Sequence, residues 1–482
     1  MKVMLINPRP LWDRLGPMER FSPAIPPLGV VWSATVLQRK GHDVRVVDQH
    51  ALGFDTCRLM GEVRTFQPQL VGFSCLTFTM DGVEEAVRCL RSDFPAVKIV
   101  LGNLHATLFH QELVQAGLCD FVVRGESEWI LPRLVASLAA GAEGAGVPGV
   151  TRRVNGQAVV EEDAPPVDLG ALPTPDWNLV SGIRYEAFRL KEYDEGPLPA
   201  AVQASRGCAF NCDFCSQNVM HPKLRMRPVD AVIAELKDLH FRLGVTTVGF
   251  VDANFPPTPA YGLEFADKME ASGLAGRMRW FTEIRVDLVD EPLISRLADV
   301  GLSLVQFGVE SGDPDVLSVM KKQAGWTDPA DAFAWCRQHG IMTVGLFVLG
   351  MPGETEQQAM TTVKLALRLD PDLAKFSVAT PYPGSGLWYK YRDELEGAPA
   401  HKFSGWLDPK RGGPHLLEGH TLPGAKLARL QRRAMRKFYL RPAKLKKLFG
   451  QGLLREETLL DGLLSLGREV VDRMVGLGKK RP

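Results

Sequence analysis

Three cysteines, Cys208, Cys212 and Cys215, lie within one segment, Ser-Arg-Gly-Cys-Ala-Phe-Asn-Cys-Asp-Phe-Cys. Thiolates hold iron–sulfur clusters, and a cluster of four irons ordinarily takes four of them. The next cysteine along the chain, Cys336, is remote and falls in a segment with helical periodicity. The spacing therefore predicts an iron–sulfur cluster held by three thiolates, with one iron open to another ligand.

Two other interpretations of these cysteines were weighed. Structural zinc sites pair two short Cys or Cys/His hooks, and the sequence contains no second hook of that kind. The three cysteines could also be neighbours without a shared function. This explains their crowding into one loop after a glycine less well than a cluster does. The remaining five cysteines fall in strand-like or helical stretches, where we expect core residues: Cys57, Cys75, Cys89, Cys119 and Cys336.

The composition is that of a globular protein with more than one domain. The 482 residues are 45% hydrophobic and 23% charged, with a net charge of +1, which does not indicate a nucleic-acid-binding protein. This length predicts two or three domains. The N-terminus lacks a secretory pattern, and we expect the reducing cytoplasm as the compartment because the cysteines suit thiol chemistry.

Residues 1–140 alternate short β-branched runs with amphipathic helical stretches, which predicts a doubly wound parallel sheet of the flavodoxin or Rossmann kind. Ligands of such sheets bind at the carboxyl ends of the strands. Helices are expected at Leu28–Lys40, Asp81–Asp93 and Thr107–Ala116, and strands at Lys2–Ile6, Asp43–Val47, Leu70–Cys75, Lys98–Leu101 and Asp120–Val123.

Small hydroxyl groups, glycines and polar side chains follow three of these predicted strands. Such residues let a polar ligand approach the backbone closely. The sequence therefore predicts a ligand site in the first domain formed by Ser74, Thr77, Thr79, Gly102, Asn103, His105, Gly125 and Glu126.

Residues 141–195 break the alternation with Gly, Ala and Pro, and we interpret them as a linker with a hairpin at Asn155-Gly156. Residues 196–385 resume it in six units, which predicts a partial (β/α)6 barrel with its site at the carboxyl ends of the strands. The expected strands are Ala201–Ser205, Thr247–Asp252, Arg279–Ile284, Leu302–Val309, Met342–Leu349 and Lys375–Ala379.

Polar residues and a glycine-rich turn stand at the ends of the barrel strands. An acid in such a place is as often a helix cap as a ligand, so each position is weak evidence on its own. We therefore take five of these residues together, as candidates for a site beside the cysteine loop: Asp252, Asn254, Arg285, Glu310 and Gly350.

The cysteine spacing, with Phe214 before the last cysteine, resembles the CxxxCxΦC signature of the radical S-adenosylmethionine (radical SAM) superfamily. The resemblance implies a [4Fe-4S] cluster whose open iron chelates SAM and whose electron cleaves SAM to a 5′-deoxyadenosyl radical. It also implies SAM contacts. Phe214, Asp252 and Asn254 are among the expected contacts, Arg285 would meet the SAM carboxylate, Glu310 would accept a hydrogen bond, and Gly350 would approach adenine.

The first domain, through Pro26-Pro-Leu-Gly29, Gly41-His-Asp-Val44 and Gly125-Glu126, resembles the cobalamin-binding domain that precedes many radical SAM enzymes. The resemblance implies that the predicted ligand site there holds cobalamin. His50 matches a cobalt-ligating DxHxxG string of other cobalamin proteins, but it follows the second predicted strand instead of the first, so we expect a solvent-facing turn. His105 is better placed, and Asn103 replaces a glycine usual in the family.

Residues 386–482 are expected to be mainly helical and to cap the barrel mouth. Lys426 to Lys447 contains ten basic residues and no acid, which predicts a basic helix broken at Pro442. Three interpretations of this basic helix remain open. It could be a solvated face packed against an acidic neighbour, it could contact a membrane surface, which the leucines of Leu453–Leu477 support, or it could bind nucleic acid. Nucleic acid is disfavoured because aromatic residues are sparse; a membrane contact would place the protein at the inner membrane surface.

The resemblance extends from about Lys2 to Pro442 and includes enzymes acting on hopanoids and on magnesium-protoporphyrin ester. It implies a cobalamin-dependent methyltransferase acting on an unactivated carbon of a lipid, isoprenoid, tetrapyrrole or natural product, with flavodoxin or ferredoxin as reductant. An oxidative cyclase or rearrangement enzyme with the same cofactors is the alternative. A noncatalytic sensor is disfavoured by the complete cysteine triad, and methylthio transfer by the lack of a second one.

Overall fold

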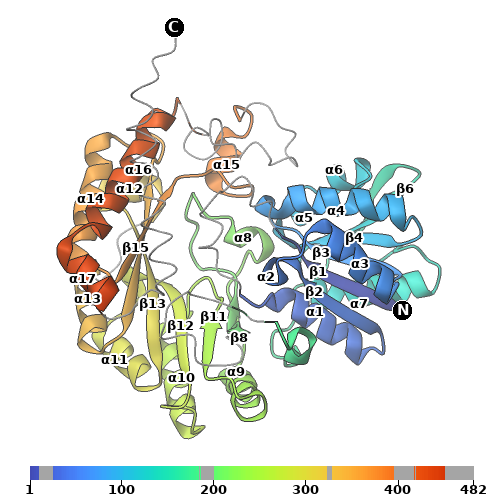
Figure 1. Cartoon of the computed structure of the whole chain (residues 1–482), viewed down its shortest axis with the longest axis horizontal. Helices are drawn as coiled ribbons and strands as arrows, with labels where there is room; N and C mark the ends of the chain where they lie inside the picture. The colour runs from blue at the N-terminus through green and yellow to red at the C-terminus, as the bar shows by residue number, and fades with distance from the viewer. Residues whose placement is uncertain are drawn as a thin grey trace.

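The computed structural model describes residues 1–9, 25–183, 185, 200–322, 328–395, 417 and 419–450. They form two α/β units followed by C-terminal helices (Figure 1). The first unit is built on a seven-stranded sheet of order β2-β1-β3-β4-β5-β6-β7. Its strands are β1 (Lys2–Asn7), β2 (Asp43–Asp48), β3 (Leu70–Ser74), β4 (Lys98–Gly102), β5 (Phe121–Val123), β6 (Val150–Val154) and β7 (Gln157–Val160).

The five strands that the sequence predicted are confirmed, and they pair in parallel. The sheet is nevertheless mixed, because β6 pairs antiparallel with β5 and β7 pairs antiparallel with β6. The predicted hairpin is present, with φ of 50° at Asn155 and 81° at Gly156. Alternation of strands and helices cannot predict this addition, because a hairpin joins a sheet edge without a crossover helix.

Helices cover both faces of the first sheet. The single helix expected at Thr107–Ala116 is instead two helices, because the chain leaves helical geometry at Phe109. There the Phe109 ring is buried against His105 and Trp388. The helices of this unit are α1 (Leu28–Arg39), α2 (Gln49–Leu52), α3 (Thr56–Phe66), the short η3 (Thr77–Thr79), α4 (Met80–Asp93), α5 (Asn103–Leu108), α6 (His110–Gln115) and α7 (Ser127–Ala139).

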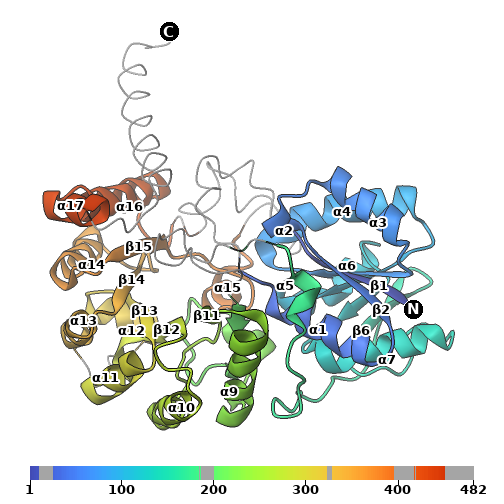
Figure 2. The ribbon, with the colours of Figure 1, turned by 60° about the horizontal axis from the view of Figure 1, so that its bottom comes forward.

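The second unit contains six parallel strands in the order β15-β14-β13-β12-β11-β8, which confirms the predicted partial barrel. The helices lie on the outer side of these strands (Figure 2). A short antiparallel pair, β9 (Ser205–Arg206) with β10 (Arg225–Met226), closes the base of the cysteine loop. The barrel strands are β8 (Ala200–Val202), β11 (Thr247–Phe250), β12 (Arg279–Arg285), β13 (Leu302–Glu310), β14 (Met342–Leu349) and β15 (Leu373–Val378).

The helices of the barrel pack apolar faces on this sheet, and the core they form also takes in Trp32 of α1 from the first unit. The α-helix Val229–Lys237 continues directly into a π-helical segment at Asp238–Arg242. The helices are α8 (Gln217–Met220), α9 (Val229–Lys237), α10 (Pro259–Ala271), α11 (Glu291–Asp299), α12 (Pro314–Val319), α13 (Pro329–Gln338) and α14 (Glu356–Leu369).

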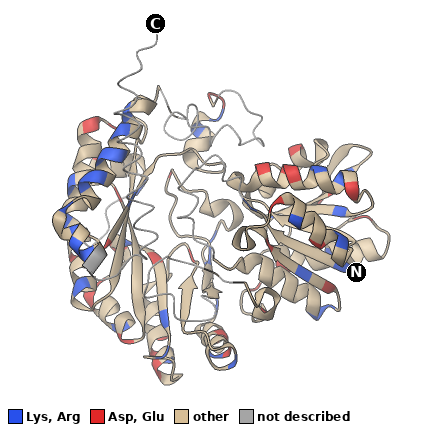
Figure 3. Cartoon of the chain, viewed as in Figure 1, with Lys and Arg blue, Asp and Glu red and all other residues tan. Residues whose placement is uncertain are grey.

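Three C-terminal helices are described: α15 (Gly386–Tyr391), α16 (Gly424–Tyr439) and α17 (Pro442–Gly450). The predicted break at Pro442 is confirmed. Blue stretches of the ribbon mark the Lys and Arg residues of α16 and α17 along the barrel (Figure 3). Several basic residues of this C-terminal region pair with acids of the barrel at Glu356, Asp370 and Asp372.

These ion pairs favour the interpretation of a basic face packed on an acidic neighbour. The leucine-rich stretch of residues 453–477 lies outside the described residues. Among the helices that the structure describes, none is both long enough and apolar enough to cross a lipid bilayer.

Candidate functional site

The cysteine loop leaves β9 at Gly207 and returns to β10. Gly207 has a φ of 86°, and a Cβ there would lie 2.3 Å from the carbonyl oxygen of Lys223. Glycine is therefore required immediately before Cys208. Burial, and then the nearby Cys212 and Cys208, raise the pKa of the Cys215 thiol. All three cysteines that the sequence predicted to act together lie on this loop.

Asp252 and Asn254, which follow β11, hold the start of this loop. The Asp252 carboxylate accepts hydrogen bonds from the Ala204 and Ser205 amides and from the Ser205 hydroxyl at 2.6 Å. Burial raises the pKa of Asp252 to about 7. The Asn254 amide donates to the Cys208 sulfur at 3.4 Å. Asp252 therefore anchors the backbone before the loop, whereas Asn254 contacts a sulfur.

Arg285 ends β12 and lies against the same loop. Its guanidinium forms two hydrogen bonds with Asp287, at 3.0 and 2.6 Å, and donates to the Cys212 sulfur at 3.4 Å. The Phe210 ring lies 3.9 Å from the guanidinium carbon. The structure therefore brings Arg285 to a cysteine and to an aromatic residue of the loop.

Glu310 ends β13 at a bulge and has a φ of 67°, a left-handed conformation unusual for a residue other than glycine. Lys322 contacts its carboxylate at 2.9 Å and also donates to the Gly308 carbonyl at 2.7 Å. Glu283 lies close by, and burial and the Glu310 charge both raise its pKa. Backbone strain of this kind concentrates at functional sites.

Gly350, after β14, has a φ of 86°, and its amide donates to the buried Glu354 carboxylate. The amide of Met351 donates to the same oxygen at 3.0 Å. Phe214 of the cysteine loop packs against the hydrophobic cluster that contains Met351. The turn after β14 and the last part of the cysteine loop are thus joined by one hydrophobic cluster.

The polar residues predicted in the first unit gather at the carboxyl edge of its sheet. Asn103 donates to the Ser74 hydroxyl at 2.9 Å, and Thr77 lies 3.3 Å from Nδ1 of the fully buried His105. Asn103 has a φ of 76°, so this position needs the left-handed backbone that glycine adopts most easily. Asparagine tolerates it better than most residues, which explains how it can replace a glycine.

Three other residues that follow strands of this sheet form local contacts. The Thr79 hydroxyl bonds to the backbone of Leu76 at 2.9 and 3.0 Å and so stabilises its own turn. His50 lies half-buried on α2, not in the expected solvent-facing turn, because Asp48 caps this short helix. Gly125 has a φ of 93° and donates to the Thr107 hydroxyl at 3.2 Å.

The two carboxyl edges meet beside the cysteine loop. Helix α5, which follows β4 in the first unit, packs against α8, which follows the cysteines. A Cβ at Gly384 would lie 2.4 Å from the Val219 side chain and 3.2 Å from that of Leu108. The ligand edge of the first unit and the cysteine loop therefore face one shared region.

Comparison with known proteins agrees with this arrangement. Residues 18–135 match the B12 binding domain, and residues 202–366 match the radical SAM superfamily. An uncharacterized methyltransferase of Pyrococcus horikoshii is 30% identical over 421 residues, which cover 86% of this chain and 88% of that protein. The chain belongs to the cobalamin-binding radical SAM enzymes.

Two further relatives show the range of this family. Anaerobic magnesium-protoporphyrin IX monomethyl ester cyclase of Cereibacter sphaeroides is 28% identical, covering 87% of this chain and 68% of the cyclase. The structure of the radical SAM methyltransferase TsrM from Kitasatospora setae superimposes with a TM-score of 0.68 at 22% identity, covering 82% of this chain and 77% of TsrM. That superposition concerns the fold.

Enzymes with these two domains use a [4Fe-4S] cluster, SAM and cobalamin, and the described residues fit the cluster. A cavity of about 200 Å³ is lined by Cys212 and Cys215. Within the described ranges, no three His, Cys, Asp or Glu side chains converge closely enough to hold a single metal ion. A cubane takes one thiolate per iron and therefore needs sulfurs that are spread apart.

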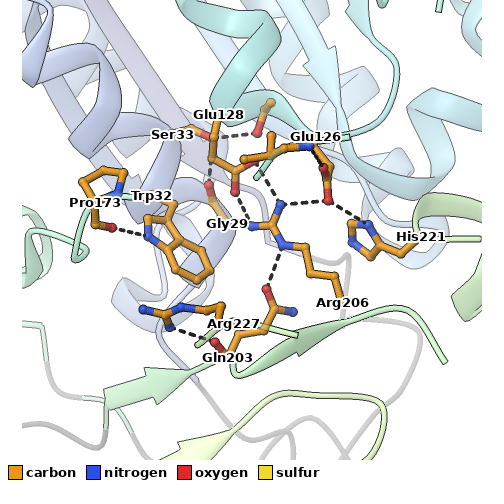
Figure 4. A network of polar contacts seen from close by, with 12 residues as sticks. Gly29, Trp32, Ser33, Glu126, Glu128, Pro173, Gln203, Arg206, His221 and Arg227 are labelled. Carbon is orange, nitrogen blue, oxygen red and sulfur yellow. Dashed lines mark hydrogen bonds and ion pairs between the residues drawn. The ribbon is translucent and has the colours of Figure 1, made fainter. Parts of the chain in front are cut away.

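A largely buried set of ion pairs joins the two domains of this radical SAM enzyme, and we call it the domain clamp: Arg206, His221 and Arg225 with Glu126 and Glu128. Figure 4 shows Arg206 and His221 with the two acids. Arg206 bridges both acids, 3.0 Å from Glu126 and 2.6 Å from Glu128. Burial acts to raise the pKa of Glu126, but hydrogen bonds from His221 and Arg225 outweigh it and hold that pKa well below its usual range.

The clamp engages the side chain of Glu126. Its carboxylate is occupied by His221 at 3.1 Å, by Arg225 and by the Val167 amide at 2.5 Å. The cobalamin contact predicted at Glu126 stays a prediction, because the structure shows only the protein partners of its carboxylate. The side chain connects the cobalamin-binding domain to both ends of the cysteine loop.

Sequence reasoning missed Lys322, the partner of Glu310, and it missed the basic half of the clamp. It also missed Trp32, which lies 5.2 Å from the Arg206 guanidinium carbon and donates to the Pro173 carbonyl at 2.7 Å. Arg206 stands two residues before Cys208, a position that could have drawn attention. No pattern along the chain indicates which acid it meets, because the partners are 80 and 78 residues away.

The buried Glu354 gives a pH prediction for the turn after β14. Burial raises the pKa of this carboxyl from 4.5 to about 7. The folded protein therefore holds the Glu354 proton more tightly than the unfolded chain. The stability that this provides is fully present below pH 4.5 and is lost as pH rises through 7, by at most about 3 kcal/mol in the free energy of unfolding. Glu354→Gln should remove that part of the pH dependence. Thermal unfolding between pH 4.5 and 8 tests this, with the exposed Glu112→Gln as control; equal pH slopes for wild type and Glu354→Gln would contradict it.

Proposed function

We propose that this enzyme transfers a methyl group from SAM to an unactivated carbon of a lipid, isoprenoid, tetrapyrrole or natural product. The observation that carries the proposal is the meeting of the two carboxyl edges, where α5 packs on α8. When bound, the cluster supplies the electron that cleaves SAM, and cobalamin supplies the methyl donor. A relative described as a methyltransferase matches nearly the whole chain, which supports the same reaction class.

Each domain has a defined part in this proposal. Cys208, Cys212 and Cys215 hold the cluster, and the strained Glu310 with its partner Lys322 offers charge beside it for SAM. The edge that carries Asn103, Ser74, Thr77 and His105 holds cobalamin. The protein contributes by fixing the cofactors and the substrate relative to each other and by excluding water.

A cyclisation or rearrangement is the second candidate. The match to the magnesium-protoporphyrin ester cyclase, over 87% of this chain, favours it independently of the geometry. Both reactions consume SAM and need a reductant. A lipid substrate, flavodoxin or ferredoxin as the donor, and contact of the basic C-terminal helices with an anionic membrane stay predictions.

Incubation of the reconstituted enzyme with methyl-labelled SAM, a strong reductant and candidate lipid or tetrapyrrole extracts tests the proposal. We expect 5′-deoxyadenosine and S-adenosylhomocysteine in equal amounts, and a product that carries the label. Deoxyadenosine with an unlabelled product that has lost hydrogen would assign the cyclase reaction instead. No SAM cleavage under any of these conditions would contradict both candidates.

A further inference from the structure

Each cysteine sulfur of the loop accepts one hydrogen bond from an N–H group. Asn254 Nδ2 donates to Cys208 at 3.4 Å, and Arg285 Nη1 donates to Cys212 at 3.4 Å. The backbone amide of Gln217 donates to Cys215, also at 3.4 Å. The donors come from three different elements, after β11, at the end of β12 and at the start of α8. The loop is thus surrounded by donors that point to its sulfurs.

The two side-chain donors are held in place by their other contacts. The Asn254 carbonyl oxygen accepts from the Arg285 amide at 2.9 Å, which couples the two residues. The Asp287 carboxylate accepts hydrogen bonds from the two other guanidinium nitrogens of Arg285, and the Phe210 ring lies against the same guanidinium. Asn254 is 9% and Arg285 is 7% exposed. Buried donors with their remaining groups satisfied keep a fixed direction, and their electrostatic effect is little screened by water.

We propose that Asn254 and Arg285 raise the reduction potential of the cluster by donating to its thiolates. Reduction adds negative charge to the cluster, and a nearby N–H dipole or guanidinium charge stabilises that added charge. Both residues are therefore tuning residues that act on the cluster through its ligands. The inference rests on the proposed ligands Cys208, Cys212 and Cys215, and it holds for either reaction proposed above.

The inference gives these two residues a different role from the one that resemblance implied. Arg285 was expected to meet the SAM carboxylate, yet three of its donor groups already bind Asp287 and Cys212. We infer that the Arg285 charge acts on the cluster and that SAM meets other groups.

An EPR-monitored redox titration of reconstituted protein, without SAM, tests the inference. At a fixed applied potential, the ratio of reduced to oxidised cluster should fall about threefold in Asn254→Ala and about tenfold in Arg285→Met, since a tenfold change corresponds to about 59 mV for one electron. Arg285→Lys retains the charge and should recover part of the loss. Gln217→Ala retains the backbone donor and should match the wild type.

Iron and sulfide are measured first on every variant. Retention of iron by Cys212→Ala would refute the ligand assignment, whereas full iron with an unchanged potential in both Asn254→Ala and Arg285→Met would overturn the tuning role alone. If Arg285→Met loses iron, the reduction potentials of Asn254→Ala and Arg285→Lys decide whether the tuning role holds. If these variants bound SAM with a tenfold higher dissociation constant while the reduction potential stayed unchanged, the inference would be overturned in favour of SAM contacts.

Discussion

Cys212→Ala is expected to abolish the iron–sulfur cluster and all SAM cleavage while cobalamin binding is retained. Two thiolates leave the cubane with two open irons, and such a cluster is not held through anaerobic purification. The edge predicted to hold cobalamin belongs to the first sheet, whose hydrophobic clusters are formed almost entirely by residues of the first unit. Iron and sulfide content, the cobalamin absorption spectrum and the yield of 5′-deoxyadenosine measure the three parts of the prediction.

Cys336→Ala is the matched control for this experiment. Cys336 is fully buried on α13, and burial raises the pKa of its thiol to about 12, so it is a core residue in the protonated form. The control should keep full iron and SAM cleavage and lose some stability. 5′-Deoxyadenosine formation by Cys212→Ala, or loss of iron from Cys336→Ala, would contradict the assignment of the three ligands.

Arg206→Met is expected to destabilise the junction between the two domains by about 3–5 kcal/mol, the usual cost of removing one partner from a buried ion pair. Glu126 and Glu128 are 8% and 7% exposed, and the substitution leaves both carboxylates buried with less compensation. Calorimetry should show a lower unfolding temperature and a separation of the transitions of the two domains. Iron content is measured in parallel, because Arg206 precedes the cysteine loop.

Arg296→Met provides the comparison for the clamp. Arg296 also bridges two acids, Asp267 and Glu270, but both acids are largely exposed, and surface pairs contribute at most about 1 kcal/mol. The two variants remove the same charge and differ in burial. Equal effects on the unfolding temperature would refute the view that the clamp joins the domains.

The β/α alternation allowed the strands of both sheets to be predicted, because each strand is a short β-branched run between amphipathic helices. The hairpin at Asn155-Gly156 was predicted, but its place at the edge of the first sheet was not. A turn sequence does not indicate which strand the hairpin pairs with. The break at Phe109 was also missed. It depends on packing against Trp388, which lies far along the chain.

The site shows the same limit at the level of side chains. Cysteine spacing located Cys208, the ends of the predicted barrel strands located Asn254 and Arg285, and the structure brings all three together. The sequence could not predict that Glu126 forms ion pairs with Arg206 and Arg225, because buried ion pairs between domains depend on how the domains dock. The chemistry of a loop is therefore easier to predict from sequence than the partners of its charged groups.

The most direct test is a crystal structure of the anaerobically reconstituted protein with anomalous data at the iron and cobalt edges. We expect iron within bonding distance of the sulfurs of Cys208, Cys212 and Cys215, and cobalt at the carboxyl edge of the first sheet near Asn103 and His105, across the shared region from the cluster. Iron bound at other residues, or cobalt at a site remote from this region, would contradict the account.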